Sequence, residues 1–159
     1  MGAGKTTVMG EASDLLMSRG IQHVAIDLDA ISLQLLPEPL SRQVHFRNVA
    51  AISRNCLDAG IDTFLLAGAV ESGDDLAELR KALNTDTITL ARLTAPLETM
   101  AARLRLREPG IRQDEFVDRS RSLDGVLATA ALEDFAIAND RRSVTAVAEE
   151  LLARAGWIK

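Results

Sequence analysis

Met-Gly-Ala-Gly-Lys-Thr-Thr, residues 1–7, is the stretch that decides the fold. Its Gly4-Lys5-Thr6 completes the pattern Gly-x-x-x-x-Gly-Lys-Ser/Thr, in which backbone N–H groups of a loop surround phosphate oxygens. A helical pattern follows at once, and the positive end of a helix dipole favours an anion there. The stretch therefore predicts a nucleotide phosphate site at the start of a helix.

The first half of that pattern, and the strand that normally presents it, are absent from the sequence. The first glycine of the pattern would lie two positions before Met1. Because this strand is normally central, its loss would leave a gap in the hydrogen-bonded ladder. We therefore expect that the sequence begins at an internal methionine, or that another chain or a tag fills the slot. The alternative is a flexible glycine-rich tail in which Thr6 or Thr7 caps the helix.

The composition indicates one globular domain over residues 1–159, since 47% of the residues are apolar. The net charge of −5, and an aromatic content of 3% without tyrosine, argue against a nucleic-acid partner. No apolar run approaches the roughly 20 residues of a membrane span. The single cysteine, Cys56, cannot form an internal disulfide, so we expect a cytoplasmic protein.

Helical and strand-like patterns alternate along the chain, which predicts an α/β fold with a parallel sheet between layers of helices. Gly20 and Gly60 end two of the helices, and Pro109-Gly110 breaks another. The predicted helices are residues 6–19, 41–59, 74–83, 95–107, 112–131 and 143–155, and the predicted strands are residues 21–27, 63–67, 87–93 and 134–138.

Two carboxylates, Asp27 and Asp29, flank Leu28 at the end of the strand-like segment Val24-Ala25-Ile26. Alternate residues of an extended segment point to one side, so both can face the phosphate loop. We expect Asp27 to hold magnesium or its waters, and Asp29 to accept or orient the proton of an attacking hydroxyl. Asp29 can also cap a short helical turn near Ala30. The strand at 63–67 ends without an acidic residue, which favours a kinase over a motor-type ATPase.

Arginines gather where the helix at 95–107 ends. Arg103 and Arg107 share a helix face, and Pro109-Gly110 supplies a hinge, so residues 103–112 are predicted to form a lid that closes over ATP. The planar guanidinium binds phosphate oxygens in pairs. The alternative is a solvated basic helix end that the helix dipole favours. Arg119 and Arg121, on the next helix, are expected at the surface.

Arg47 and Asn48 begin the apolar part of a helix that should lie beside the second substrate, and His45 is expected to pack rather than to bind metal. Together with the loop and the acidic pair, this order of residues resembles the adenylylsulfate, shikimate and gluconate kinase group of P-loop kinases over nearly the whole chain. Asn139-Asp140 resembles the stretch where such kinases hold adenine. The resemblance implies five parallel strands, a lid and magnesium-dependent transfer of the ATP γ-phosphate to a hydroxyl.

The motifs and the resemblance together predict the site residues, with a Walker A loop at residues 2–7. Catalytic roles fall to Lys5, Asp29, Arg103 and Arg107; nucleotide binding to Gly2, Ala3, Gly4, Lys5, Thr6, Thr7, Asn139 and Asp140; magnesium binding to Thr6 and Asp27; and acceptor binding to Asp29, Arg47 and Asn48.

The predicted function is an ATP- and Mg²⁺-dependent kinase whose acceptor is a small metabolite, nucleoside-like compound or antibiotic. The acceptor stays open, because Phe46 is the only nearby aromatic candidate for stacking a sulfonucleotide. A catalytically silent nucleotide-binding or interaction domain, and a truncated non-functional fragment, are the alternatives. The oligomeric state stays open as well.

Overall fold

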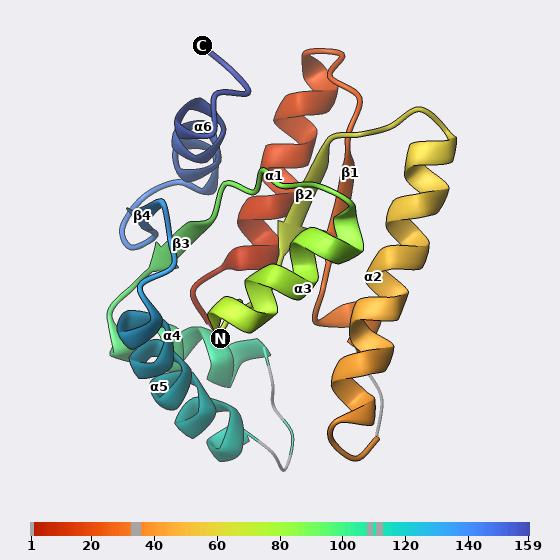
Figure 1. Cartoon of the computed structure of the whole chain (residues 1–159). Helices are drawn as coiled ribbons and strands as arrows, with labels where there is room; N and C mark the ends of the chain where they lie inside the picture. The colour runs from red at the N-terminus through yellow and green to blue at the C-terminus, as the bar shows by residue number, and fades with distance from the viewer. Residues whose placement is uncertain (1, 33–35, 108–109, 111–112) are drawn as a thin grey trace. The chain divides into compact units, whose positions relative to one another are not determined.

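A computed structural model describes residues 2–32, 36–107, 110 and 113–159 of the chain. Met1 of the predicted phosphate loop and residues 108, 109, 111 and 112 of the predicted lid lie outside this described part. Helices and strands alternate as expected, and all strand pairs are parallel (Figure 1), so the predicted α/β class is confirmed. The elements in chain order are α1 (Lys5–Ser18), β1 (Val24–Asp27), the 3-10 turn η1 (Ala30–Ser32), α2 (Leu40–Asp58), β2 (Phe64–Ala67), α3 (Gly73–Leu83), β3 (Ala91–Thr94), α4 (Leu97–Arg107), α5 (Gln113–Ala130), β4 (Phe135–Ala138) and α6 (Val144–Arg154).

The chain divides into two compact units. Unit 1 joins Met1–Ala12 to Thr89–Lys159 and so contains the start of α1 together with β3, α4, α5, β4 and α6. Unit 2 is the contiguous segment Ser13–Ile88, with the rest of α1, β1, η1, α2, β2 and α3. The residues of the predicted phosphate loop therefore belong to unit 1, and the acidic pair belongs to unit 2.

Within the described residues, the four strands form two separate two-stranded sheets. In unit 2, β1 pairs with β2 from Val24↔Phe64 to Asp27↔Ala67. In unit 1, β3 pairs with β4 from Ala91↔Phe135 to Thr94↔Ala138. On the described part of the chain, each strand therefore has one strand neighbour.

Unit 2 is built around an apolar core between its sheet and the helices α2 and α3. The buried side chains of this core are Ile26, Leu28, Val49, Leu79 and Leu83. Helix α3 begins where Ser72 accepts a hydrogen bond from the N–H of Asp75, and it ends at Asn84 in the left-handed conformation. The helix α2 in turn carries the residues that the sequence places beside the second substrate.

Unit 1 combines an apolar contact between α4 and α5 with an ion-pair network on β3. Ala101, Leu104 and Val117 form the apolar cluster. Arg92 of β3 donates hydrogen bonds to Asp124 (2.8 Å) and to Glu133 (3.4 Å). Burial lowers the pKa of Arg92, but these two carboxylates outweigh burial and leave that pKa above its ordinary value. The network joins β3 to α5 and to the segment that leads into β4.

None of the helices in the part of the chain that the structure describes is both long and apolar enough to cross a membrane.

Candidate functional site

Residues 2–4 of unit 1 are packed and hydrogen-bonded. Gly2 and Gly4 adopt positive φ angles of 76° and 88°, and Ala3 between them is only 8% exposed. The side-chain Nδ2 of Asn139, just beyond β4, donates a buried hydrogen bond of 2.7 Å to the carbonyl oxygen of Ala3. This arrangement disagrees with the alternative of a flexible glycine-rich tail, because that tail would have no buried partners.

The two glycines are required by close neighbours as well as by their φ angles. A Cβ on Gly2 would lie 2.6 Å from the carbonyl oxygen of Met100 in α4. A Cβ on Gly4 would lie 2.4 Å from Nδ2 of Asn139. Any side chain at either position would therefore displace the backbone of α4 or the amide of Asn139.

Helix α1 starts directly after this loop. The N–H of Val8 donates to the carbonyl of Gly4 at 2.9 Å, so the first helical turn contains Lys5, Thr6 and Thr7. Helix N-termini attract anions, since the first N–H groups of a helix lack intrahelical acceptors and the dipole is positive there. Lys5 is half-buried and the two threonines are exposed, which makes this turn a suitable place for a phosphate group.

Arg103 brings a positive charge to the loop. Its Nη2 donates to the backbone carbonyl of Asn139 at 2.9 Å, whereas its Nη1 is buried without a hydrogen-bond partner. A Cβ on Gly4 would lie 4.0 Å from that Nη1. Beside it, Thr99 donates its hydroxyl to Asp140 at 3.1 Å. The structure therefore brings together two predicted nucleotide-binding residues, Gly4 and Asn139, and one predicted catalytic residue, Arg103.

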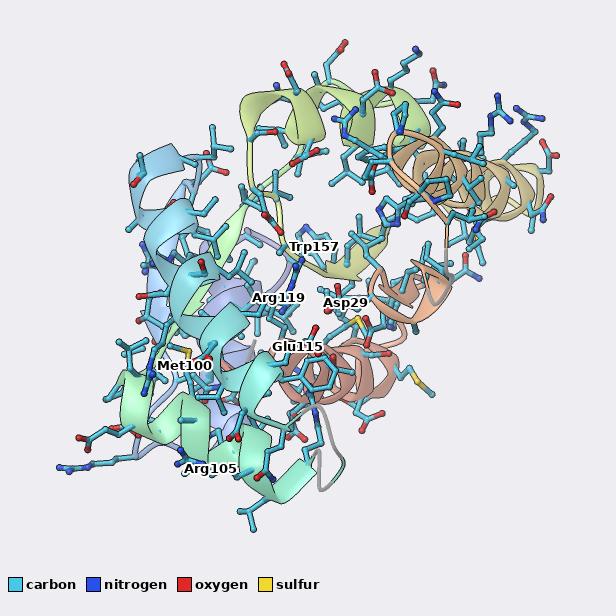
Figure 2. All side chains as sticks on the ribbon, turned by 90° about the horizontal axis from the view of Figure 1, so that it is seen from below. Asp29, Met100, Arg105, Glu115, Arg119 and Trp157 are labelled. Atoms are coloured by element: carbon cyan, nitrogen blue, oxygen red, sulfur yellow. The ribbon has the colours of Figure 1, made fainter. Side chains whose placement is uncertain are left out.

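The other arginines of this region lie on exposed parts of α4 and α5. Arg107 is exposed at the last position of α4, and Arg105 lies half a turn before it (Figure 2). On α5, Glu115 and Arg119 are one turn apart (Figure 2), and Arg119 is exposed as the sequence predicts. Arg121 is exposed too and pairs with Asp118 at 3.5 Å. In the described part of the predicted lid, Arg103 is half-buried, and Arg105 and Arg107 are exposed.

The acidic pair of unit 2 lies where β1 ends and the chain turns. Asp27 is the last residue of β1, and its Oδ1 accepts the N–H of Asp29 at 3.0 Å. Leu28 between them is buried and donates its N–H to the carbonyl of Ala67 at 2.8 Å. The expectation that both carboxylates share one side of an extended strand is wrong in its geometry, since residues 28–29 form a turn. Asp29 is exposed and directly precedes η1, the position of a helix cap.

Helix α2 carries a cluster of polar and aromatic side chains in unit 2. Asn48 donates to the carbonyl of Ile31 in η1 at 3.3 Å, which ties the predicted acceptor residue to the turn after Asp29. Arg47, its neighbour, is exposed. The rings of His45 and Phe46 meet edge to face, with their centroids 4.9 Å apart.

A second pair in this cluster, Arg42 with Asp75, is not among the residues that the sequence predicts for the site. Arg42 donates from Nε and Nη2 to Asp75 Oδ1, at 3.1 and 2.9 Å, and its guanidinium lies 5.1 Å from the centre of the Phe46 ring. Residues 42, 45 and 46 are three and four apart on α2, so helical spacing could have grouped them. The Asp75 partner, 33 residues away, could not have been found that way.

The pKa of His45 is lowered from its ordinary value of 6.5, chiefly by burial and further by Arg42, against the opposing pull of Asp29 and Asp75. A lowered folded-state pKa means that the unfolded chain binds more protons between that pKa and 6.5. We expect the stability that neutral His45 contributes to be present above pH 6.5 and to be lost as the pH falls through the folded-state pKa. Urea unfolding of the wild type and of His45→Gln from pH 7.5 to 5 measures this. The variant should lose less stability on acidification, and parallel curves for the two proteins would contradict the expectation.

The residues of unit 1 fit a triphosphate. A helix N-terminus and Lys5 supply positive potential, and the buried Nη1 of Arg103 has no hydrogen-bond partner. A buried charged donor without an acceptor costs free energy, which an anion at the loop would remove. Magnesium typically takes one or two protein oxygens beside phosphates and water, and the Thr6 hydroxyl of unit 1 is of that kind. No group of three or more His, Cys, Asp or Glu residues in the described ranges could hold a metal by itself.

Comparison with known proteins shows the fold. No protein-family model and no curated protein matches the sequence. Among solved structures, the chain is similar to the Mycobacterium tuberculosis APS kinase CysC in complex with AMPPNP and APS, with a TM-score of 0.65 and 16% identity over 98% of this chain and 92% of that one. It is similar to an unliganded sugar kinase from Janibacter sp. HTCC2649, with a TM-score of 0.64 and 22% identity over 98% and 90%. A third similar structure, of APE1195, has a TM-score of 0.64 and 17% identity over 99% and 91%. At these identities the likeness establishes the fold, and the expected P-loop kinase fold is confirmed.

Proposed function

We propose that this chain, which has the fold of the P-loop kinases, is an ATP- and magnesium-dependent kinase that transfers the γ-phosphoryl group to a hydroxyl of a small molecule. The observation that carries the proposal is the loop cluster of unit 1. There Gly4 lies against the amide of Asn139, and Arg103 keeps a buried Nη1 without a partner. A cationic donor without an acceptor, beside a glycine loop and a helix N-terminus, is suited to an anion such as phosphate.

Each residue of the cluster has a role in this proposal. ATP supplies the phosphoryl group, and Mg²⁺ neutralises charge on its phosphates. Lys5 and the N–H groups of the first turn of α1 hold the β and γ phosphates, and Arg103 stabilises the charge that develops during transfer. Thr6 would supply an oxygen ligand for Mg²⁺, and Asp27 is the second ligand that the sequence assigns to it. Because phosphoryl transfer depends on positioning and charge, these residues need no covalent chemistry of their own.

On the acceptor side, Asp29 receives the proton of the attacking hydroxyl, and Arg47 and Asn48 orient the acceptor. The contact between Asn48 and Ile31 supports this, since it fixes an amide beside the turn that follows Asp29. Phe46 already contacts Arg42 and His45 and packs against the core of unit 2. That packing favours a hydroxylated metabolite over an acceptor that must stack on a free aromatic ring.

The test is a phosphoryl-transfer assay with Mg·ATP and a panel of sugars, nucleosides, adenylylsulfate, shikimate and aminoglycosides. A true acceptor should give ADP in proportion to phosphorylated product. Asp29→Asn should then lower kcat by about a hundred-fold or more with little change in ATP affinity, because it removes a general base and keeps the shape. The matched control is Asp58→Asn at the end of α2, which should retain the wild-type rate. A wild type that does not bind Mg·ATP would overturn the proposal.

One observation favours a second candidate, a catalytically silent or incomplete nucleotide-binding domain. The described strands form two separate two-stranded sheets. Each of these strands therefore has one edge whose backbone N–H and C=O groups pair with no other described strand. This candidate expects ordinary ATP affinity without turnover across the panel. If the sheet limits activity, fusing an apolar strand that ends in glycine ahead of residue 1 should raise both thermal stability and turnover.

A further inference from the structure

The turn between β4 and α6 contacts the phosphate loop directly. Asn139, 8% exposed, follows β4, and its backbone N–H donates to the carbonyl of Thr94 at 2.7 Å, which extends the β3–β4 pairing by one bond. Its backbone carbonyl accepts from Arg103, and its side-chain amide donates to Ala3. One residue therefore connects the sheet of unit 1, helix α4 and the loop.

The side-chain amide of Asn139 also orients the backbone carbonyl and N–H groups of the loop. Because the carbonyl oxygen of Ala3 accepts the hydrogen bond from Nδ2 of Asn139, that oxygen points towards the residue that follows β4. Peptide planarity then fixes the orientation of the N–H of Gly4 within the loop. A loop that binds phosphate must present N–H groups, and not carbonyl oxygens, to the anion.

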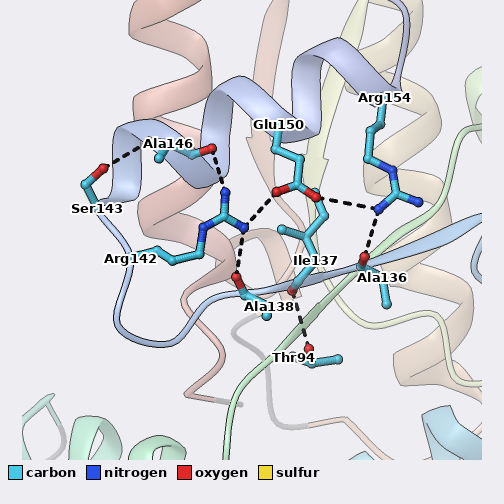
Figure 3. A network of polar contacts seen from close by, with 9 residues as sticks. All are labelled: Thr94, Ala136, Ile137, Ala138, Arg142, Ser143, Ala146, Glu150 and Arg154. Carbon is cyan, nitrogen blue, oxygen red and sulfur yellow. Dashed lines mark hydrogen bonds and ion pairs between the residues drawn. The ribbon is translucent and has the colours of Figure 1, made fainter.

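The turn that carries Asn139 is braced on both sides (Figure 3). Arg142 donates from Nη1 to the carbonyl of Ala138 (3.3 Å) and to Glu150 (2.7 Å), and from Nη2 to the carbonyl of Ala146 (3.2 Å). Ser143 caps α6 by accepting the N–H of Ala146. The backbone on either side of residue 139 is thus held before any ligand arrives.

We propose that Asn139 is a positioning residue for the phosphate loop: its amide orients Ala3 and Gly4, and its own placement depends on the braced turn between β4 and α6. The inference rests on the proposed function for its ligand. It differs from the role that the family resemblance assigns to this residue, because the side chain acts on the loop rather than on adenine. Replacing it should therefore weaken binding of the triphosphate and spare binding of adenosine.

The experiment compares the wild type with Asn139→Ala and Asn139→Ser, the second of which keeps a shorter donor. Binding of inorganic tripolyphosphate with Mg²⁺ and binding of adenosine are measured separately by calorimetry. We expect Asn139→Ala to lose about tenfold in tripolyphosphate affinity, as the loss of one buried hydrogen bond predicts, with adenosine affinity within about twofold of the wild type. Asn139→Ser should lie in between. Arg141→Asn, in the same turn, is the matched control, since the Arg141 side chain is 93% exposed and asparagine tolerates its positive φ of 54°.

A second readout needs no ligand. Amide hydrogen exchange at residues 3–6 should speed up in Asn139→Ala, whereas exchange within α6 should stay at the wild-type rate. Unchanged exchange at residues 3–6, or a loss confined to adenosine binding, would overturn the inference. Should the wild type bind neither probe, the proposed function fails while the exchange result still decides the role of Asn139.

Discussion

Lys5→Ala is expected to lower kcat/KM for ATP-dependent phosphoryl transfer by about a hundred-fold to a thousand-fold, the range for removing one pre-organised charge from a phosphoryl-transfer site. Lys5 is the first residue of α1 and follows Gly4, so its ammonium group adds to the positive end of the helix dipole. The ammonium group and the helix dipole both attract the three or four negative charges of the ATP phosphates. Steady-state kinetics and calorimetric titration of Mg·ATP measure the loss.

The chain offers a matched control, because Lys81 in the last turn of α3 is exposed. Lys81→Ala should keep the wild-type kcat/KM, and Lys5→Arg should recover part of the loss by restoring the charge. Equal activity of Lys5→Ala and Lys81→Ala would exclude residues 2–7 as a working phosphate loop.

Gly4→Ala should have the second largest effect, on stability and on ATP binding together. Its φ of 88° is unfavourable for alanine, and the new Cβ would lie 2.4 Å from Nδ2 of Asn139, so the bond from Asn139 to Ala3 must break or the loop must move. Strain and a lost buried hydrogen bond together cost roughly 2–4 kcal/mol. We expect a lower thermal midpoint and more than a tenfold loss of ATP affinity.

Gly10→Ala is the control for that substitution. Gly10 lies inside α1, and a Cβ at this position would have no neighbouring atom within 4 Å. Its φ angle is not positive. Alanine there should stabilise the helix by about 0.5–1 kcal/mol. If the two alanine variants shift the thermal midpoint in the same direction, the close packing of the loop against Asn139 is not present in solution.

The helices could be predicted to within one or two residues, because their ends carry local chemistry. Ser72 and Ser143 cap α3 and α6 with their hydroxyls, and Gly20 and Gly60 take positive φ angles just after α1 and α2. Signals of this kind need no knowledge of the rest of the chain.

The predicted strands begin earlier than the observed ones, because a strand extends only over the residues that pair with a neighbouring strand. Residues 87–90 resemble a strand in composition, but Thr85 Oγ1 accepts the N–H of Thr87 in a turn, and β3 starts at Ala91, opposite Phe135. The predicted strand at 21–27 likewise shortens to Val24–Asp27, the four residues that pair with β2. Pairing is a long-range property that a local pattern does not contain.

The site could be predicted in its residue types and less well in its contacts. The loop and the acidic pair could be predicted because glycine and lysine at this spacing, and carboxylates after a strand, are typical of nucleotide sites. Their roles in the reaction stay predictions. The hydrogen bond from Asn139 to Ala3 joins residues 136 positions apart, and the pair of Arg42 and Asp75 joins α2 to α3. Neither contact can be predicted from the spacing of residues along the chain.

The division of the chain has a consequence for how the protein folds as it is made. Unit 2 is contiguous, so all its contacts can form once residue 88 has been synthesised. Unit 1 must bring Met1–Ala12 back to Thr89–Lys159, which closes a loop over the whole of unit 2 at an entropic cost of about 4 kcal/mol. Ala3 and Gly4 can therefore reach Asn139, their neighbour in unit 1, only after residues 13–139 have been synthesised, so their native contacts form late.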